Sequence, residues 1–516
     1  MFAEQAYLFR HALVREAAYE LQTPGHRAEL HRVAAFAVID LYDGHPDDDL
    51  ADDICRHLQF ARADKDSAEL EATEFHYLKK AAHYAAAEWR HTDAVRLYMR
   101  LCTMGDIESR ARSAIAASSE QQFLGNIEAA QQILKQALDE HSGFPKVRIE
   151  RAYGRVLYLR NQLEQAETVA KRCVEYCRKH NEAELLSICL NDLGSVLQAR
   201  SQGDQAMAAY MEASTVDGSS AGSALANIGT LHYEKGDYEN ALDYYEQALA
   251  LHRTRGDKQA EAITLGNIGA ILRLKGSTDT AERHYLDGIR LCREIGDVPL
   301  LASFYSKLAN LCNQLGRLDQ AAELFRSAIE IERESSAGPA FAQTLCNFGL
   351  ALSDRGEPQE AESAFREAVA VLEANPNRRF ESFARGCLGQ HLLETNRLAE
   401  AELHLRRAVE LGDEIGDVIG KALNMATLGG CRRGAGELQE AESLERQSIA
   451  LLEAAKDMHG VGTGRCGLAM TLYAQGRRDE ADTEWEAGSS EIRRANDPMT
   501  LKNLQKQWNR IRNAGD

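Results

Sequence analysis

Apolar residues recur along this chain at spacings of three and four, with polar residues between them. Segment 229–251 is typical, because two such stretches flank the glycine at 236. In the second stretch the apolar positions are Ala241, Tyr244, Tyr245, Ala248 and Leu249. This spacing places them on one face of a helix, and glycine readily adopts the left-handed conformation that ends a helix. The pattern predicts two helices joined by a tight turn.

The same pattern returns every 40 residues. An alanine marks the second helix of seven copies: Ala241, Ala281, Ala321, Ala361, Ala401, Ala441 and Ala481. Five residues before each alanine stands a turn residue: Gly236, Gly276, Gly316, Gly356, Asn396, Gly436 or Gly476. Asparagine also tolerates the left-handed conformation. A period of this length predicts a stack of like units, each of which buries its apolar face against its neighbours.

A second small residue lies in the first helix of each copy, seven positions before the turn. The series is Gly229, Gly269, Ala309, Gly349, Gly389, Gly429 and Ala469. Glycine inside a helix costs about 1 kcal/mol relative to alanine, so its recurrence predicts a close backbone approach that a larger side chain would block. Larger residues of the second helices keep a fixed register and are expected to fill the core: Tyr245, Tyr285, Phe325, Phe365, Leu405 and Trp485.

This combination of a Leu-Gly pair, a Gly-Asp pair and alanines flanking an aromatic residue resembles the tetratricopeptide repeat. The 40-residue period departs from the usual 34 and resembles the longer variety found in MalT-type bacterial regulators, kinesin light chains and G-protein-signalling adaptors. Connectors such as Gly256-Asp257, Gly296-Asp297 and Gly416-Asp417 are part of that resemblance. It implies an all-α fold, an α-solenoid in which helix-turn-helix units stack into a right-handed superhelix.

The repeat register extends backward through Ala206, Ala166, Ala130 and Ala94. We therefore expect about 11 repeat units over residues 73–495, with a weak point at the Gly/Ser-rich segment 216–224. Asp497 can cap a final helix at 496–516. That helix carries Leu501, Leu504, Trp508 and Ile511 on one face and is expected to cover the last repeat.

Residues 1–72 are helical in pattern but out of the repeat register. Phe9, Leu13 and Tyr19 form an apolar stripe, and the segment resembles the junction at which STAND-class signalling ATPases pass from their NTPase module into helical repeats. The resemblance implies that this segment packs against an NTPase module encoded upstream. The phosphate-binding pattern G-x-x-x-x-G-K-[ST] does not occur in the sequence.

The charge balance argues against nucleic-acid binding. There are 60 basic and 79 acidic residues, a formal charge of −19, which repels phosphate backbones. No apolar run is long enough for a membrane span, and the first twenty residues have no apolar core typical of a secretory signal. The 11 scattered cysteines indicate a reducing compartment, so we expect a cytoplasmic protein.

No constellation of residues supports catalysis or a cofactor. Cys173 and Cys177 lie one helical turn apart and could bind a soft metal with His180, or could simply pack as small apolar residues. The glycines at 460, 462 and 464 follow no strand, which argues against a dinucleotide site. We therefore expect a protein that is not an enzyme.

The remaining candidate site is the groove that the first helices line in tetratricopeptide arrays. The register assigns to it Asn227, Tyr233, Asn267, Arg273, Lys307, Asn310, Asn313, Asn347, Gln390 and Arg433. Amides both donate and accept, so a ladder of them suits the backbone of an extended peptide, although the same residues could be merely solvated. Lys307 and the arginines offset nearby acids, so a peptide with some carboxylates could fit. The sequence predicts a protein-binding scaffold of bacterial-style signalling or, alternatively, the sensor arm of a split or truncated STAND ATPase or transcription regulator.

Overall fold

The computed structural model describes residues 19–62, 67–216, 218–335, 338–374, 376–495 and 497–515. Over these ranges the regular structure is α-helical apart from the short 3₁₀ helix η1 (Asp48–Leu50), and there is no strand. The chain divides into two compact units, Met1–Leu251 and His252–Asp516. The expectation of an all-α fold is confirmed.

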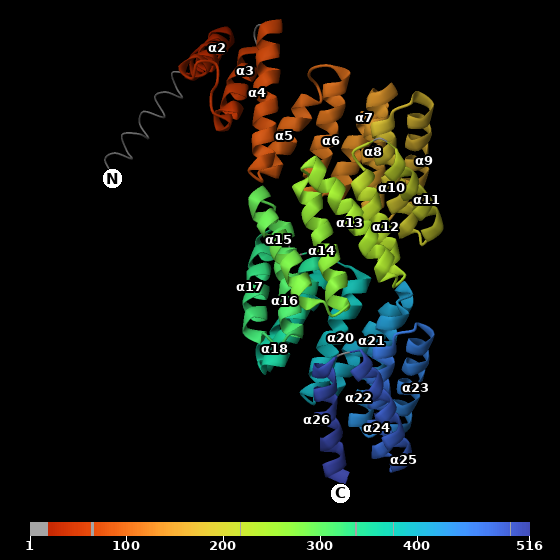
Figure 1. The fold of residues 1–516 in the computed structure, drawn as a ribbon. Coiled ribbons are helices and arrows are strands. Elements are labelled where there is room, and N and C mark those ends of the chain that lie inside the picture. Colours follow the sequence, from red (N-terminus) through yellow and green to blue (C-terminus); the bar gives the residue numbers. More distant parts are fainter. Residues whose placement is uncertain are drawn as a thin grey trace, which may run out of the picture. The chain divides into compact units, whose positions relative to one another are not determined.

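The first unit contains the helices from α2 to α12 (Figure 1). Their bounds are α2 Pro24–Leu41, α3 Ala51–Arg62, α4 Ala68–Ala87, α5 His91–Leu101, α6 Ile107–Phe123, α7 Ile127–Glu140, α8 Gly143–Leu159, α9 Leu163–His180, α10 Ala183–Ala199, α11 Gly203–Thr215 and α12 Ala221–Glu234. The boundary between the units falls within α13, Tyr238–Arg255.

The second unit contains the helices from α14 to α26. Their bounds are α14 Lys258–Leu274, α15 Thr278–Ile295, α16 Val298–Gln314, α17 Leu318–Ser335, α18 Pro339–Arg355, α19 Pro358–Ala374, α20 Arg378–Glu394, α21 Leu398–Ile415, α22 Val418–Gly434, α23 Leu438–Ala454, α24 Met458–Ala474, α25 Arg478–Arg494 and α26 Pro498–Gly515.

The helices pair in the order of the sequence. Each helix from α2 to α12, and again from α14 to α26, contacts the next helix along the chain. Successive even-numbered helices also contact each other, as α6 contacts α8. This holds from α6 to α12 in the first unit and from α14 to α24 in the second. The first helices of successive pairs therefore form a continuous layer in each unit, which we call the first-helix face.

The turns within and between the pairs follow the sequence pattern. Gly276 has φ of 76° and Asn396 has φ of 62°, so both adopt the left-handed conformation predicted for them. In the Gly-Asp connectors the glycine ends one helix and the aspartate begins the next. At Asp297, for example, the carboxylate accepts a hydrogen bond from the backbone N–H of Leu300 at 3.0 Å.

The small residues of the first helices make room for a side chain of the second helix. A Cβ atom added at Gly269 would lie 2.5 Å from the ring of Tyr285, and one added at Gly349 would lie 2.5 Å from the ring of Phe365. The predicted close approach is confirmed, but the nearest neighbour is the residue sixteen positions later and not mainly backbone. The repeat alanines are fully buried: Ala241, Ala281, Ala321, Ala361, Ala401, Ala441 and Ala481.

The two ends of the chain lie outside the repeat pairs. At the C-terminal end, Trp508 of α26 stacks on Trp485 of α25 with ring centroids 4.9 Å apart. At the N-terminal end, the hydroxyl of Tyr19 lies 2.8 Å from Nε2 of His31. Phe9 and Leu13 of the predicted apolar stripe fall outside the described residues. Among the helices described, none is long and apolar enough to cross a membrane.

Candidate functional site

A groove runs across three neighbouring first helices of the second unit, α18, α20 and α22. It has a volume of about 410 Å³ and is lined by Gln343, Leu350, Arg379, Phe380, Ser382, Phe383, Gly386, Cys387, Gln390, Asp417, Gly420, Leu423, Asn424 and Thr427. Each helix contributes one large apolar side chain that is exposed: Leu350 (39%), Phe383 (40%) and Leu423 (40%). Amides from the same three helices lie beside them. The groove therefore combines an apolar strip with groups that can both donate and accept hydrogen bonds.

Four of the predicted site residues occupy one repeat position on successive first helices. Asn227 lies on α12 of the first unit, and Asn267, Lys307 and Asn347 lie on α14, α16 and α18 of the second. The amide of Asn227 donates to Asn191 Oδ1 at 2.9 Å. Asn267 and Asn347 are partly buried, and their side chains make no hydrogen bond within the described part of the chain.

Lys307 differs from the three asparagines because its amine is held inside the helix layer. Nζ donates to Ser303 Oγ at 2.6 Å and lies 5.8 Å from the centroid of the Phe304 ring. Burial lowers the pKa of Lys307 below that of an ordinary lysine. No carboxylate of the described residues forms an ion pair with this amine, so an incoming carboxylate would find a cation without an anionic partner.

Most of the other predicted site residues bond within the chain. The amide of Asn310 donates to the backbone oxygen of Ser306 at 2.9 Å, and that of Asn313 donates to Asp354 at 3.0 Å. Arg273 donates to Gln314 at 3.0 Å.

Three predicted residues have more distinctive surroundings. Gln390 lines the groove and donates to Glu394 at 2.7 Å. Tyr233, in the first unit, has its ring 5.8 Å from that of Tyr238. Arg433 binds inside the layer between helices, as described below.

Eleven helix pairs carry a repeat alanine, when Ala94, Ala130, Ala166 and Ala206 are added to the seven above, and the residue four positions later lies in the layer between the two helices of the pair. In nine pairs this residue is large, apolar or aromatic, and buried: Tyr98, Leu134, Tyr210, Tyr245, Tyr285, Phe325, Phe365, Leu405 and Trp485. Two pairs break the rule. Ala170 occupies the position in α9, and Glu445 occupies it in α23. Each exception changes the local chemistry.

At Ala170 the exception leaves a cavity. Gly154 of α8 lies against Val169 of α9, whose Cγ1 would be 3.3 Å from a Cβ added at this glycine, and Ala170 beside it carries only a methyl group. A cavity of about 300 Å³ lies there between α8, α9 and α10. Its apolar wall is formed by Ala166, Val169, Ala170 and Val196, together with the buried thiols of Cys173 and Cys189.

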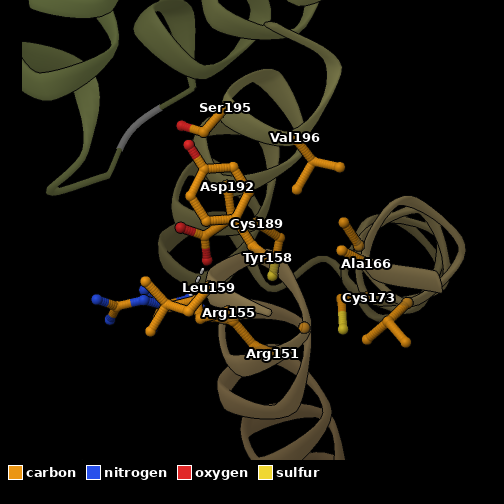
Figure 2. Close-up of a pocket in the computed structure, with 13 residues that line it drawn as sticks. Arg151, Arg155, Tyr158, Leu159, Ala166, Cys173, Cys189, Asp192, Ser195 and Val196 are labelled. Carbon is orange, nitrogen blue, oxygen red and sulfur yellow. Dashed lines mark hydrogen bonds and ion pairs between the residues drawn. The ribbon is translucent and has the colours of Figure 1, made fainter. Parts of the chain in front are cut away.

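Polar groups gather on the side of the cavity that meets solvent (Figure 2). Arg151 Nε donates to Asp192 Oδ2 at 2.6 Å. Arg155 is exposed and forms no ion pair within the described residues. Tyr158 is 39% exposed and projects toward Ser195 in Figure 2. The cavity thus has an apolar interior and a rim with one arginine in excess over its acid.

At Glu445 the exception creates a buried ion pair. Glu445 is 1% exposed, and its Oε1 accepts from Arg433 Nη1 at 2.8 Å. The same nitrogen lies 3.1 Å from the backbone oxygen of Gly467 and 3.0 Å from Thr471 Oγ1. The other carboxylate oxygen has no hydrogen-bond partner within the described residues. Arg433 therefore joins α22 to α23 and α24.

We expect Glu445 to make a pH-dependent contribution to the free energy of unfolding. Burial raises the pKa of Glu445 above the ordinary glutamate value of about 4.3. Because the folded chain then holds this proton more tightly than the unfolded chain, the free energy of unfolding falls as the pH rises from about 4.3 through the raised pKa. Glu445→Gln cannot titrate, so the wild type should lose stability relative to this variant over that interval. Urea midpoints of both proteins across the interval check this; parallel curves would contradict it.

Comparison with known protein families explains the pairing of the helices. Models of the tetratricopeptide repeat match residues 220–294, 300–374, 346–414 and 462–487. The chain carries tetratricopeptide repeats. No curated protein sequence matches it.

Several solved structures are similar to the chain. A Rap protein complexed with competence and sporulation factor has 13% sequence identity and a TM-score of 0.49, covering 78% of this chain and 99% of that one. The apo form of the quorum sensor NprR from B. thuringiensis has 18% identity and a TM-score of 0.45, covering 65% and 97%. Kinesin light chain repeats from Podosopora anserina have 19% identity and a TM-score of 0.33, covering 39% and 97%.

Three features of the structure were not predicted from the tetratricopeptide register. The exposed apolar residues Leu350, Phe383 and Leu423 were not among the expected groove residues. The cavity at Ala170 and the ion pair at Glu445 were also missed, although the sequence holds a signal for both. Ala170 and Glu445 both stand at the register position where the other pairs have a large apolar or aromatic residue.

The cysteines of α9 pack inside the first unit. Cys173 and Cys177 are buried, whereas the ring of His180 stacks on Tyr176 with centroids 4.2 Å apart. Across the part of the chain that the structure describes, no group of three or more His, Cys, Asp or Glu side chains is arranged to hold a metal ion.

Proposed function

We propose that the chain is a non-enzymatic scaffold that binds extended peptide segments of partner proteins on the first-helix face of its second unit. The observation that carries this proposal is the groove across α18, α20 and α22, where exposed apolar side chains lie beside amides. Tetratricopeptide-repeat domains are typically protein-binding modules, which agrees with this assignment.

The groove and the two unbonded amides of Asn267 and Asn347, called the asparagine ladder, supply complementary contacts for an extended peptide. Leu350, Phe383 and Leu423 can receive apolar side chains of the peptide, and the free amides of Asn267 and Asn347 can bond to its backbone. Lys307, between the two asparagines along the repeat series, favours a peptide that carries a carboxylate. The preferred partner is therefore a segment with apolar and acidic residues.

The proposal predicts that Asn267→Ala combined with Asn347→Ala weakens peptide binding without altering helicity. Each amide contributes hydrogen bonds worth about 0.5–1.5 kcal/mol, so the double variant should bind roughly 5- to 150-fold more weakly. Peptides are first selected on the wild-type chain from a displayed random library. Their dissociation constants are then measured by calorimetry for both proteins, and helicity is compared by circular dichroism.

Gln447→Ala serves as the matched control, because this exposed amide lies on α23 and is a second-helix residue. It should leave the dissociation constants unchanged. Phe383→Ser tests the apolar strip separately and should weaken peptides that carry a large apolar residue. If the selected peptides bind the double variant as tightly as the wild type, the asparagine ladder does not contribute to binding.

The wider setting of this binding is also part of the proposal. We infer that the scaffold serves a bacterial-style signalling system, in the cytoplasm, and that its repeats belong to the long variety of MalT-type regulators and kinesin light chains. We also propose three parts for the chain: a junction at 1–72, a repeat array at 73–495 and a capping helix at 496–516. The alternative proposal is that the chain is the sensor arm of a split or truncated STAND-class ATPase or transcription regulator.

A further inference from the structure

The cavity between α8, α9 and α10 is a second feature that can bind a ligand, independent of the peptide groove. It lies beside Ala170, at the register position where other pairs place Tyr, Phe or Leu against the glycine of the first helix, whereas Gly154 packs against Val169. At Gly194, for example, an added Cβ would lie 2.5 Å from the ring of Tyr210, so the next pair is filled. Close packing is the rule in protein interiors, and a void of this size is therefore a local departure from it.

The size of the cavity sets the size of its ligand. At about 300 Å³ it is twice the apolar cavity of about 150 Å³ that holds benzene in an engineered protein. A fused two-ring aromatic or a medium-length acyl chain is of the right order. Arg155, Tyr158 and Leu159 are all exposed, so the cavity opens to solvent on the side of the polar rim.

The chemistry of the walls sets the polarity of the ligand. The interior consists of aliphatic carbons and thiols, and contact with the thiols of Cys173 and Cys177, together with burial, raises the pKa of Cys189. That thiol stays neutral at physiological pH and counts as apolar surface. At the rim Asp192 is already paired with Arg151, which leaves the Arg155 guanidinium available to an anion. This excess cation stands on a chain of net charge −19.

We propose that this cavity binds a small amphipathic carboxylate, with the apolar body between α8, α9 and α10 and the carboxylate on Arg155. Tyr158, which also lines the cavity and is exposed, is placed to receive a further polar group of the ligand, whereas the Ser195 hydroxyl already donates to the backbone oxygen of Asn191 and accepts from Tyr210. Small-molecule sites generally combine a mostly apolar pocket with a few convergent polar groups, as this one does. The assignment goes beyond peptide binding by the groove and does not depend on it.

The test titrates 2-naphthoate and its neutral analogue 2-naphthol into the full chain, with calorimetry as the readout. The wild type should bind the carboxylate more tightly than the neutral probe. Arg155→Gln should weaken 2-naphthoate about tenfold or more and leave 2-naphthol nearly unchanged, because a hydrogen bond to a charged group is lost only for the carboxylate.

Ala170→Leu tests whether the probes bind in the cavity, and its urea midpoint shows whether the variant folds. Leucine is the residue that fills this position in two other pairs, at 134 and 405. The variant should abolish binding of both probes and raise the urea midpoint, since it fills a void. Ala208→Leu, which adds the same side chain at an exposed position of α11, should change neither.

Three results would overturn the proposal. Equal binding of 2-naphthoate by the wild type and Ala170→Leu would place the probe elsewhere. Failure of the wild type to bind either probe, with Ala170→Leu stabilised, would show a dry packing void. Equal affinity of the wild type for the charged and neutral probes would show that Arg155 does not bind the carboxylate.

Discussion

Replacing Arg433 with methionine while Glu445 remains is expected to lower the free energy of unfolding by about 3–5 kcal/mol. The substitution removes the guanidinium from a carboxylate that is 1% exposed and that has no other cationic partner among the described residues. It also removes the hydrogen bonds from this guanidinium to the backbone oxygen of Gly467 and to the hydroxyl of Thr471. The cost is that of a buried charge left without compensation, and it far exceeds that of a surface ion pair.

Urea denaturation of the single and double variants measures this effect. Arg433→Met with Glu445→Leu should recover most of the lost stability, because replacing a buried ion pair by apolar residues is often neutral or stabilising. Leucine at 445 also gives this pair a large apolar residue, as other pairs have four positions after the repeat alanine. Arg446→Met is the control, since the Arg446–Glu442 pair lies one turn apart on the exposed side of α23, and its loss should cost at most about 1 kcal/mol. A single variant no less stable than this control would show that the Arg433–Glu445 pair does not hold α22 to α23 and α24.

The repeat architecture could be predicted from the sequence because its physical causes are local and recur. The small residue at 269 lies against the ring at 285, and the same spacing of sixteen residues joins Gly194 to Tyr210 and Gly349 to Phe365. The turn glycines and the capping aspartates likewise act on their immediate neighbours. Forty-residue periodicity therefore identified the helix pairs and their buried alanines.

The functional surface could be predicted only in part, because a side chain's partners depend on neighbouring helices. Arg433 was expected in the groove, yet its guanidinium binds Glu445 of the following helix. Asn227 was expected to be free for a peptide, yet it bonds to Asn191 in the preceding pair, 36 residues earlier. The side chains of Asn267 and Asn347, in the same repeat position, make no hydrogen bond within the described residues. One register position thus yields different chemistry from repeat to repeat.

Phe365→Ala is expected to destabilise the chain by about 3–5 kcal/mol, the range for removing a large aromatic side chain from a packed core. Phe365 is 1% exposed, its ring lies against Gly349, and its centroid is 5.6 Å from that of His391. The substitution recreates in α18 and α19 the combination of glycine and alanine that the chain has at Gly154 and Ala170. Urea midpoints measure the loss, and Ser363→Ala on the exposed side of α19 should change the stability by no more than about 0.5 kcal/mol. A loss no larger than that of Ser363→Ala would mean that this position does not fill the layer.

The same variant also separates the two properties of the natural cavity, its volume and its rim. In the repeat register Arg151, Arg155 and Asp192 correspond to Cys346, Leu350 and Cys387, so the cavity opened by Phe365→Ala would lack the charged groups. We expect it to bind 2-naphthol and to disfavour 2-naphthoate, because burying a carboxylate without a cation is costly. Calorimetry with Phe365→Ala in the Ala170→Leu background isolates this engineered cavity. A preference for the carboxylate there would show that any void in this stack binds the probe, and that Arg155 does not set the selectivity.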